Sequence, residues 1–323
     1  MELFNSNSEI SLLFIGRLDF YEEIRKKAPK TWKVTHKDSI KNFLNSPLEV
    51  NVILDASIRE VIDLNLKEFS TVKYIACAST GTNHIKLNQN NLYDQNIFSL
   101  RDIPDFLSGL TSAAEFTFGI LIAMAKQIIP AANSTKSEIW DRTKFPGAIL
   151  KGKKLGLIGF GRIGQTMGSF AKGFNMEVAF YDPYIDNKPK KVLEYKSVES
   201  LVENSDFISV HIPYSPATHS TPFITSKIFS SFKPGSYFIN TSRGEVIDET
   251  GLIAAMESGR IVGAALDVLV GEPEIANNVV YKYAKSSGAN IIFTPHIAGY
   301  SIENLKSATT EMLLHLIDQI EST

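Results

Sequence analysis

Three side chains that could carry out acid–base chemistry each follow a predicted strand in the second half of the chain. They are Arg243 in INTSRGEVID, Glu272 in LDVLVGEPE and His296 in FTPHIAG. Imidazole changes charge near neutral pH and can move a proton, and a carboxylate on its other ring nitrogen would stabilise the imidazolium. A guanidinium can hold a carboxylate through two parallel hydrogen bonds. Taken singly, each residue also has an ordinary interpretation, as a surface turn, a solvated loop or a structural histidine.

A glycine-rich segment, KLGLIGFGRIG at 154–164, adds a possible phosphate site. It begins as a buried strand, after which Gly159 permits a tight turn and Gly161 lets the backbone approach a pyrophosphate. Gly164 allows close packing of the helix predicted for 162–172. The unpaired N–H groups and the positive dipole end of that helix would face the phosphates, so the segment predicts a dinucleotide site.

Asp182 follows the next predicted strand, 177–181, and lies 18 residues beyond Gly164. Its carboxylate can accept hydrogen bonds from the ribose hydroxyls and would repel a 2′-phosphate, which favours NAD over NADP. A glycine-rich surface turn would leave this acid unexplained. A proton carrier, a carboxylate holder and an NAD site together predict hydride transfer between NAD and a 2-hydroxy acid, with no metal site.

The elements that must position these residues alternate between strand and helix. Ligands of such sheets bind beyond the carboxyl ends of the strands. We therefore predict a Rossmann-type doubly wound parallel sheet for residues 107–299. Its further strands are expected at 207–212, 236–240, 261–266 and 291–293, and its further helices at 198–202, 226–232 and 249–258.

The first part of the chain also reads as α/β, with a smaller parallel sheet. We expect a substrate-binding domain over residues 1–106, completed by 300–323 and the helix at 302–320. An apolar helix at 111–125 could cross between domains, lie in a dimer interface or belong to a core. The predicted strands are 11–15, 51–54, 73–77 and 97–100, and the predicted helices are 20–27 and 58–64.

The composition limits the partners of the chain. Its 323 residues carry a formal charge of −2 with no long basic run, which gives no reason to expect nucleic acid or an anionic membrane. We found no apolar stretch of about 18 residues and expect no membrane insertion. The one cysteine, Cys77, lies in an apolar run and is expected to be a buried thiol, and a cytoplasmic location fits a chain without a disulfide.

Several motifs together resemble one enzyme family. They are GKKLGLIGFGRIG, YDP at 181–183, HIP at 211–213, INTSRGEVID, GAALDV, GEP, TPHIAG, TSAAEFT near 111 and STGTNHI near 79. The chain resembles the D-isomer-specific 2-hydroxyacid dehydrogenases over about 75–299, most of all their phosphoglycerate dehydrogenase-like branch. The resemblance implies D stereochemistry and a nucleotide domain inserted in a smaller flavodoxin-like α/β domain.

The resemblance also implies roles for individual residues. Arg243 would bind the substrate carboxylate and carbonyl, Glu272 with His296 would form the acid–base pair, and Asp267 would bind the nicotinamide amide. The loop of Ser79, Thr80 and Gly81 would offer backbone N–H groups to the substrate carboxylate. Further cofactor contacts are implied for the backbone of Arg162 and Ile163, and for His211, Pro213, Thr218, Thr241 and Gly299.

The substrate and the function leave alternatives. Cys77 stands where many phosphoglycerate dehydrogenases have a basic residue, and Glu272 argues against the formate dehydrogenase branch, which has glutamine there. The substrates that remain are 3-phosphoglycerate, hydroxypyruvate or glyoxylate, and lactate-like acids, handled by a homodimer built around the 111–125 helix. The alternative function is an NAD(H)-sensing, corepressor-like interaction protein with little turnover.

Overall fold

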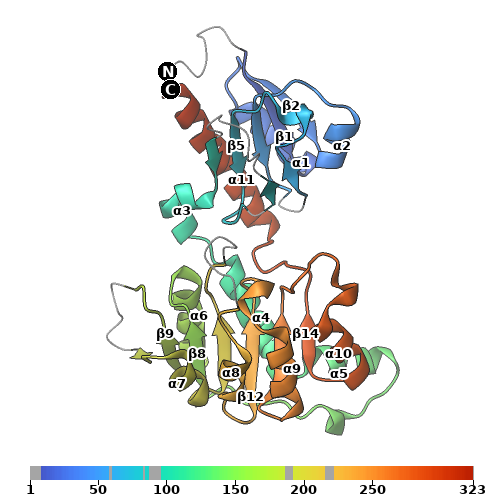
Figure 1. Ribbon diagram of the computed structural model, residues 1–323, viewed down its shortest axis with the longest axis vertical. Helices are drawn as coiled ribbons and strands as arrows, with labels where there is room; N and C mark the ends of the chain where they lie inside the picture. The colour runs from blue at the N-terminus through green and yellow to red at the C-terminus, as the bar shows by residue number, and fades with distance from the viewer. Residues whose placement is uncertain are drawn as a thin grey trace. The chain divides into compact units, whose positions relative to one another are not determined.

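The computed structural model describes residues 9–57, 60–82, 84–86, 96–185, 192–214 and 222–322. The chain divides into two compact units, each a parallel sheet with helices (Figure 1). One unit comprises Met1–Leu110 with Ser301–Thr323, and the other Thr111–Tyr300. The boundaries expected from the sequence, at 106 and 299, lie four residues and one residue from these.

The first unit contains a five-stranded parallel sheet of order β2-β1-β3-β5-β7, which is the flavodoxin-like order. Its central strands are continuous apolar runs that are buried on both faces, as parallel sheets require. The strands are β1 Ser11–Ile15, β2 Lys33–Lys37, β3 Val52–Asp55, β5 Tyr74–Cys77 and β7 Asn96–Phe98, and the helices are α1 Leu18–Lys27, α2 Ile40–Asn45, α3 Pro104–Ser108 and α11 Ile302–Glu321.

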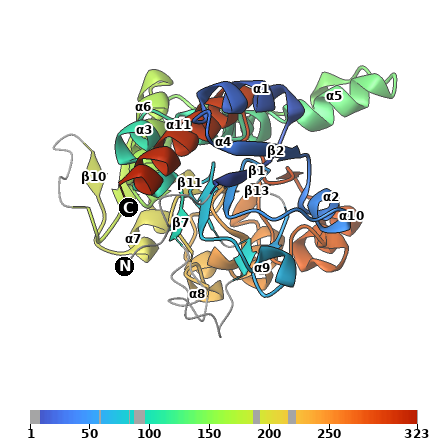
Figure 2. The ribbon, with the colours of Figure 1, turned by 90° about the horizontal axis from the view of Figure 1, so that it is seen from above.

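Helix α11 completes the first unit from the far end of the sequence. Ser301 caps it, because its hydroxyl accepts a hydrogen bond from the backbone N–H of Asn304 at 3.2 Å. The helix packs on β3, β5 and α1, and Figure 2 shows it beside α1. Its buried side chains repeat at helical spacing: Leu305, Ala308, Thr309, Met312, Leu313, Leu316 and Ile320.

One sequence expectation for this unit is wrong. Residues 58–64 were predicted to be helical, but Ile62–Asp63 is a short strand, β4, paired in parallel with β6 at Ile85–Lys86. Residues 58 and 59 lie outside the described part of the chain. Backbone pairing with a segment more than twenty positions away therefore overrides the local helical pattern. A short window of the sequence does not contain that pairing partner.

The second unit contains a seven-stranded sheet of order β10-β9-β8-β11-β12-β13-β14, and each described strand pair is parallel. This confirms the predicted doubly wound sheet. The strands are β8 Lys154–Ile158, β9 Glu177–Tyr181, β10 Leu193–Glu194, β11 Phe207–Val210, β12 Ser236–Asn240, β13 Ile261–Leu266 and β14 Ile291–Phe293. The helices are α4 Ser112–Ala125, α5 Ile128–Lys136, α6 Arg162–Gly173, α7 Val198–Glu203, α8 Ser226–Ser230, α9 Glu249–Glu257 and α10 Val279–Ser287.

Two apolar clusters form the core of this sheet. One contains residues of α7, α8 and α9, and the other contains residues of α4 and α6. Neighbouring residues of one strand enter different clusters, as Phe238 and Ile239 of β12 do. This follows from the alternation of side chains across a strand, and it places helices on both faces of the sheet.

The segment Pro104–Ala125 is long and apolar enough to cross a membrane, so the expectation that no such stretch exists is wrong. In the structure the segment is two helices, α3 and α4, separated around Gly109. Helix α4 packs on α6 and β13, and Leu121 and Met124 are fully buried there. The buried residues of α4 belong to the core of the second unit, while the part of the helix in a dimer stays a prediction.

Candidate active site

The glycine turn follows β8 and leads into α6. Gly159 has φ of +91°, and a Cβ there would lie 2.7 Å from the carbonyl oxygen of His211. A Cβ at Gly164 would lie 2.4 Å from the carbonyl oxygen of Gly159, whereas a Cβ at Gly161 would meet nothing within 4 Å. The outer glycines are therefore required by packing, and the middle one faces open space at the helix N-terminus, next to Arg162 and Ile163. This arrangement fits the pyrophosphate of a dinucleotide.

Asp182 lies directly after β9 and is tied to the glycine turn. Its Oδ2 accepts a hydrogen bond from the backbone N–H of Phe160 at 2.8 Å, and its Oδ1 accepts one from Tyr184 at 2.9 Å. Each carboxylate oxygen has a second acceptor position, so Asp182 can also receive ribose hydroxyls. The structure thus adds a bracing role that the sequence did not reveal.

His211 follows β11, the strand that lies beside β8 where the strand order reverses. Its Nε2 is buried and has no hydrogen-bond partner within the described residues. Burial lowers the pKa of His211 to about 3, so the ring is neutral at physiological pH. Pro213 is exposed two residues on, and Thr218 lies outside the described residues.

Asn240, the last residue of β12, shapes the turn that carries Arg243. The Asn240 side chain is fully buried, its Oδ1 accepts the backbone N–H of Ser242 at 3.0 Å, and its Nδ2 donates to the carbonyl of Arg243 at 2.8 Å. The guanidinium donates to the carbonyl of Ser242 at 2.7 Å. The cation is therefore held on a braced turn at the carboxyl end of the sheet.

The next strand end carries Glu272, and its loop is packed against the Arg243 loop. A Cβ at Gly244 would lie 2.3 Å from the carbonyl carbon of Leu269, so only glycine allows this backbone approach. The backbone N–H of Leu269 donates to Glu272 Oε2 at 3.3 Å. Two neighbouring loops thus place a guanidinium and a carboxylate on the same edge of the sheet.

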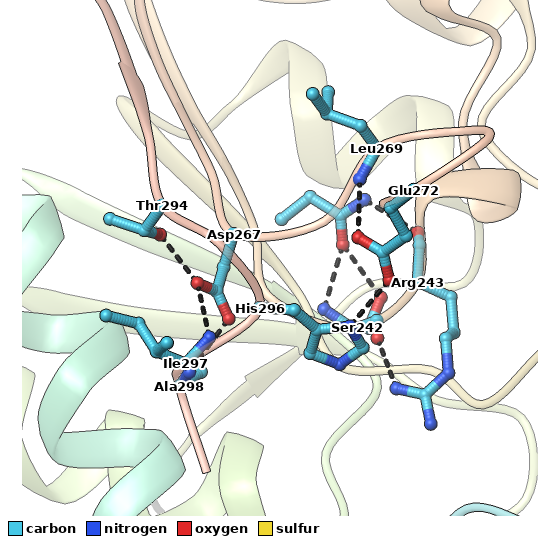
Figure 3. A network of polar contacts seen from close by, with 10 residues as sticks. Ser242, Arg243, Asp267, Leu269, Glu272, Thr294, His296, Ile297 and Ala298 are labelled. Atoms are coloured by element: carbon cyan, nitrogen blue, oxygen red, sulfur yellow. Dashed lines mark hydrogen bonds and ion pairs between the residues drawn. The ribbon is translucent and has the colours of Figure 1, made fainter. Parts of the chain in front are cut away.

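His296 follows β14, and its Nδ1 lies 2.5 Å from Glu272 Oε1 (Figure 3). The side chains are 45% and 31% exposed, so both are within reach of a ligand. Because Nδ1 faces the carboxylate, Nε2 lies on the opposite side of the ring. The pair that the sequence predicted is therefore in contact, with one imidazole nitrogen oriented by an acid.

Asp267 lies at the end of β13 and holds the turn of His296. Its Oδ1 accepts hydrogen bonds from the Thr294 hydroxyl at 2.6 Å and the backbone N–H of Ile297 at 2.9 Å, and its Oδ2 accepts from Ala298 at 2.8 Å. The residue is 1% exposed, and burial raises the pKa of its carboxyl against these hydrogen bonds. The described hydrogen bonds of its side chain are with the histidine turn, and the nicotinamide contact implied by the resemblance stays a prediction.

Two other predicted cofactor residues lie near these loops in the second unit. The hydroxyl of Thr241, after β12, is 2.8 Å from that of Thr117 on α4, which brings this helix to the strand end. Gly299 follows the histidine turn and is exposed. A contact of either residue with NAD stays a prediction.

The predicted substrate loop belongs to the first unit, directly after β5. Ser79 donates its hydroxyl to the carbonyl of Gly81 at 2.7 Å, and the backbone N–H of Leu100 donates to the Ser79 carbonyl at 2.9 Å. Thr80, between Ser79 and Gly81, is half-buried. A joint role of this loop with Arg243 stays a prediction. Cys77, at the end of β5, is fully buried, which confirms the expected buried thiol.

Sequence reasoning missed the residues that brace the reactive ones, chiefly Asn240, Thr294 and Thr117. Each is a polar residue in or beside an apolar segment: Asn240 ends SYFIN, Thr294 follows IIF, and Thr117 lies within an apolar helix. Buried polar groups need hydrogen-bond partners. A polar residue in such a place was the signal that could have found them.

The sheet order and the glycine turn define a doubly wound, dinucleotide-binding α/β protein. The particular family follows from sequence comparison. The profile described as "D-isomer specific 2-hydroxyacid dehydrogenase, NAD binding domain" matches residues 118–298. The chain belongs to this family, and NAD is its cofactor.

Several characterised relatives are similar to the chain. D-3-Phosphoglycerate dehydrogenase of Methanocaldococcus jannaschii is 39% identical over 205 residues, covering 62% of this chain and 37% of that protein. Glyoxylate reductase of Thermococcus litoralis is 33% identical over 270 residues, covering 81% and 78%. The chain spans 49% of the Bacillus subtilis D-3-phosphoglycerate dehydrogenase, so it matches less than two thirds of these longer relatives.

Solved structures share the fold along almost the whole chain. The apo-structure of D-lactate dehydrogenase from Escherichia coli has a TM-score of 0.78 at 23% identity and covers 97% of this chain and 98% of that one. The NAD-complexed D-isomer specific 2-hydroxyacid dehydrogenase of Lactobacillus delbrueckii ssp. bulgaricus has a TM-score of 0.73 at 20% identity, covering 97% of each.

Proposed function

We propose that the chain is an NAD-dependent oxidoreductase that interconverts a D-2-hydroxy acid and the corresponding 2-keto acid. The observation that carries this proposal is the 2.5 Å contact between His296 Nδ1 and Glu272 Oε1. Arg243 follows β12, the strand next to the one that Glu272 follows. A proton carrier with an orienting acid and a neighbouring guanidinium is the set of groups that the reaction needs.

Each side chain has a separate task in the reduction of a keto acid. Bound NADH supplies the hydride. Protonated His296 donates a proton from Nε2 to the carbonyl oxygen, while Glu272 on Nδ1 stabilises the imidazolium and fixes the ring. Arg243 binds the substrate carboxylate and polarises the carbonyl, so that negative charge forming on its oxygen is stabilised. In the oxidation the same imidazole, neutral, accepts the hydroxyl proton.

The substrate is proposed to be a small acid without a phosphate, glyoxylate or hydroxypyruvate. Glyoxylate reductases are among the relatives that this chain matches over more than two thirds of both lengths. At the end of β5 the chain has a buried cysteine, Cys77, where many phosphoglycerate dehydrogenases have a basic residue. The loop of Ser79, Thr80 and Gly81 would then bind the carboxylate through backbone N–H groups.

Oxidation of NADH with a panel of keto acids tests the function and the substrate together. The panel is glyoxylate, hydroxypyruvate, pyruvate, 2-ketoglutarate and phosphohydroxypyruvate. We expect the highest kcat/KM with glyoxylate or hydroxypyruvate. Preference for phosphohydroxypyruvate would overturn the substrate proposal alone. NADH binding without turnover on any acid would overturn the enzyme proposal and favour an NAD(H)-sensing interaction protein.

We also propose a cytoplasmic homodimer whose interface includes α4 and the segment that follows it. Large apolar side chains are exposed there: Trp140 is 90% exposed, Ile128 50% and Ile129 41%. Large apolar side chains that stay exposed along one segment favour an interface there. Light scattering should give twice the chain mass, and Trp140→Glu should shift the measured mass toward that of a single chain. A monomeric wild-type chain would contradict the dimer. The proposed location is tested separately, by fractionation of cells.

A further inference from the structure

A second group of reactive side chains lies in the first unit, at the carboxyl end of its sheet. Asp55 ends β3, Cys77 ends the neighbouring strand β5, and His84 immediately precedes β6. The ligand atoms of the three residues all lie within 4.8 Å of one another. His84 Nε2 is 3.0 Å from Asp55 Oδ2 and 3.8 Å from Cys77 Sγ.

This group is buried, which separates it from an ordinary surface cluster. Asp55 and Cys77 are fully buried, and the His84 side chain is 14% exposed. Asp55 Oδ1 accepts two hydrogen bonds from Ser57, from its backbone N–H at 2.9 Å and from its hydroxyl at 2.6 Å. These bonds fix the carboxylate so that Oδ2 faces His84. The donor atoms are thus held in place by the fold.

The arrangement of the three side chains suits ligands of one cation and differs from that of a catalytic triad. In a triad, the nucleophile contacts one imidazole nitrogen and the acid contacts the other. Here the thiol and the carboxylate both lie beside the same nitrogen, Nε2 of His84. A proton cannot pass through the ring from Cys77 to Asp55 in this arrangement. Three donor atoms instead converge on one small region.

We propose that Asp55, Cys77 and His84 bind one zinc ion. Sulfur, imidazole nitrogen and carboxylate oxygen are the ligands that zinc takes in proteins, and three protein ligands leave a fourth position for water or another small ligand. Magnesium and calcium prefer sites made of oxygen atoms, so a site with a thiol and an imidazole selects against them.

The same contacts explain how the site rests without the ion. Burial, together with the nearby Asp55 carboxylate, raises the pKa of the Cys77 thiol, so the sulfur stays protonated when no cation is present. His84 Nε2 and Asp55 Oδ2 lie at hydrogen-bond distance, 3.0 Å. Zinc would take the place of the thiol proton, because a sulfur ligand must be deprotonated.

The position of the ligands gives the ion a structural task. Cys77 and His84 flank the loop that contains Ser79, Thr80 and Gly81, and Asp55 holds them against β3. One ion would therefore join both ends of this loop to the sheet. The binding site stands independently of the proposed dehydrogenase activity. Only the consequence for substrate binding depends on that activity.

Cobalt(II) is the probe, because it replaces zinc and gives a thiolate-to-metal charge-transfer band in the near ultraviolet. The chain has one cysteine, so any such band must come from Cys77. We expect one equivalent of cobalt to produce the band in the full chain and one equivalent of zinc to abolish it. Native mass spectrometry should show one zinc per chain.

Two variants test proposed ligands, and a third is the control. Cys77→Ser should abolish the band, and His84→Gln should weaken cobalt binding by more than the roughly 10–100-fold that loss of an outer-shell partner costs. His296→Gln, which removes an exposed histidine of the second unit, should leave the cobalt titration unchanged.

No band with cobalt in excess over wild-type chain would overturn the proposal. A band of unchanged affinity in His84→Gln would also overturn it, since the thiol would then bind metal without the cluster. If Cys77→Ser does not fold, the wild-type and His84→Gln titrations still decide the question. If the wild-type chain turns over no acid of the panel but titrates with cobalt as expected, the dehydrogenase proposal is refuted and the metal site still stands.

Discussion

The backbone N–H of His296 donates a hydrogen bond to the backbone carbonyl of Asp267 at 2.8 Å, although 29 residues separate them. The Asp267 carboxylate receives three further hydrogen bonds from the same turn. His296 itself has φ of +55°, a left-handed conformation that a non-glycine residue adopts only where its surroundings enforce it. The reactive imidazole therefore owes its orientation to a buried acid on the neighbouring strand.

Asp267→Asn tests this bracing role. The amide NH2 group cannot accept a hydrogen bond, so at least one backbone N–H of Ile297 or Ala298 loses its partner. We expect kcat to fall more than tenfold and the free energy of unfolding to fall by ~1–3 kcal/mol. Urea unfolding and steady-state kinetics measure the two effects. Thr294→Val, which removes one donor, should have a smaller effect on both. An Asp267→Asn chain that loses NADH affinity as strongly as kcat would instead indicate a direct nicotinamide contact.

His296→Ala separates chemistry from cofactor binding. The glycine turn and Asp182 are attached to β8 and β9, whereas His296 follows β14 at the far edge of the sheet. We expect turnover to fall by roughly 10²–10⁴-fold, the usual value of general acid catalysis, with the NADH dissociation constant nearly unchanged. Fluorescence titration with NADH measures that constant. Glu272→Gln keeps a hydrogen-bond acceptor without the charge and should lie between wild type and His296→Ala. Equal losses of turnover and cofactor affinity in His296→Ala would contradict the division of tasks.

Asp182→Asn tests the basis of cofactor choice. The single oxygen of asparagine can still accept the backbone N–H of Phe160, so the glycine turn stays braced while the negative charge is removed. The backbone N–H of Tyr184 then loses its acceptor, which lowers stability but does not touch the glycine turn. The ratio of kcat/KM for NADH to that for NADPH should fall at least tenfold, because a 2′-phosphate is no longer repelled. Asp182→Ala should relax the ratio similarly and also lower stability, since Phe160 loses its acceptor. An unchanged ratio in both variants would remove the case for a ribose contact.

His211 makes the stability of the chain depend on pH. Its pKa is about 3 when folded and 6.5 when unfolded, so between these values the unfolded chain binds the extra proton. The stability contribution is complete above pH 6.5 and is lost as the pH falls toward 3. From pH 7 to pH 5, we expect about 2 kcal/mol less stability from this residue.

Urea unfolding without cofactor at pH 7 and pH 5 checks this contribution. His211→Asn should lose about 2 kcal/mol less than wild type over that interval. The interval stops at pH 5 because carboxylates with lowered pKa, such as Asp248 with a pKa of about 2, add their own loss at lower pH. The same pH dependence in wild type and variant would show that His211 is not the buried neutral group.

The strands that bear the site were predictable because parallel strands buried on both faces are short apolar runs. β9, β12, β13 and β14 begin and end at the predicted residues. Arg243, Glu272 and His296 follow from the rule that ligands bind at carboxyl strand ends. The contact between Glu272 and His296 was proposed from residue types, and the structure places the two in hydrogen-bond contact.

What the sequence did not reveal depends on contacts between distant segments. The bracing by Asp267 joins β13 to the turn after β14, and the group of Asp55, Cys77 and His84 joins three segments with no metal-binding spacing. Strand β2 was missed because its KVTHK sequence is polar and half-exposed at the edge of the sheet. No local window contains the partners that decide these features.

The first unit is closed by α11, whose apolar face covers β3 and β5. A ribosome synthesises the second unit as one continuous stretch, so it can fold as soon as it emerges. The strands made first keep one apolar face uncovered until α11, Ile302–Glu321, is translated. Until that point the apolar face of the early strands is exposed in the nascent chain, where it can associate with other apolar surfaces.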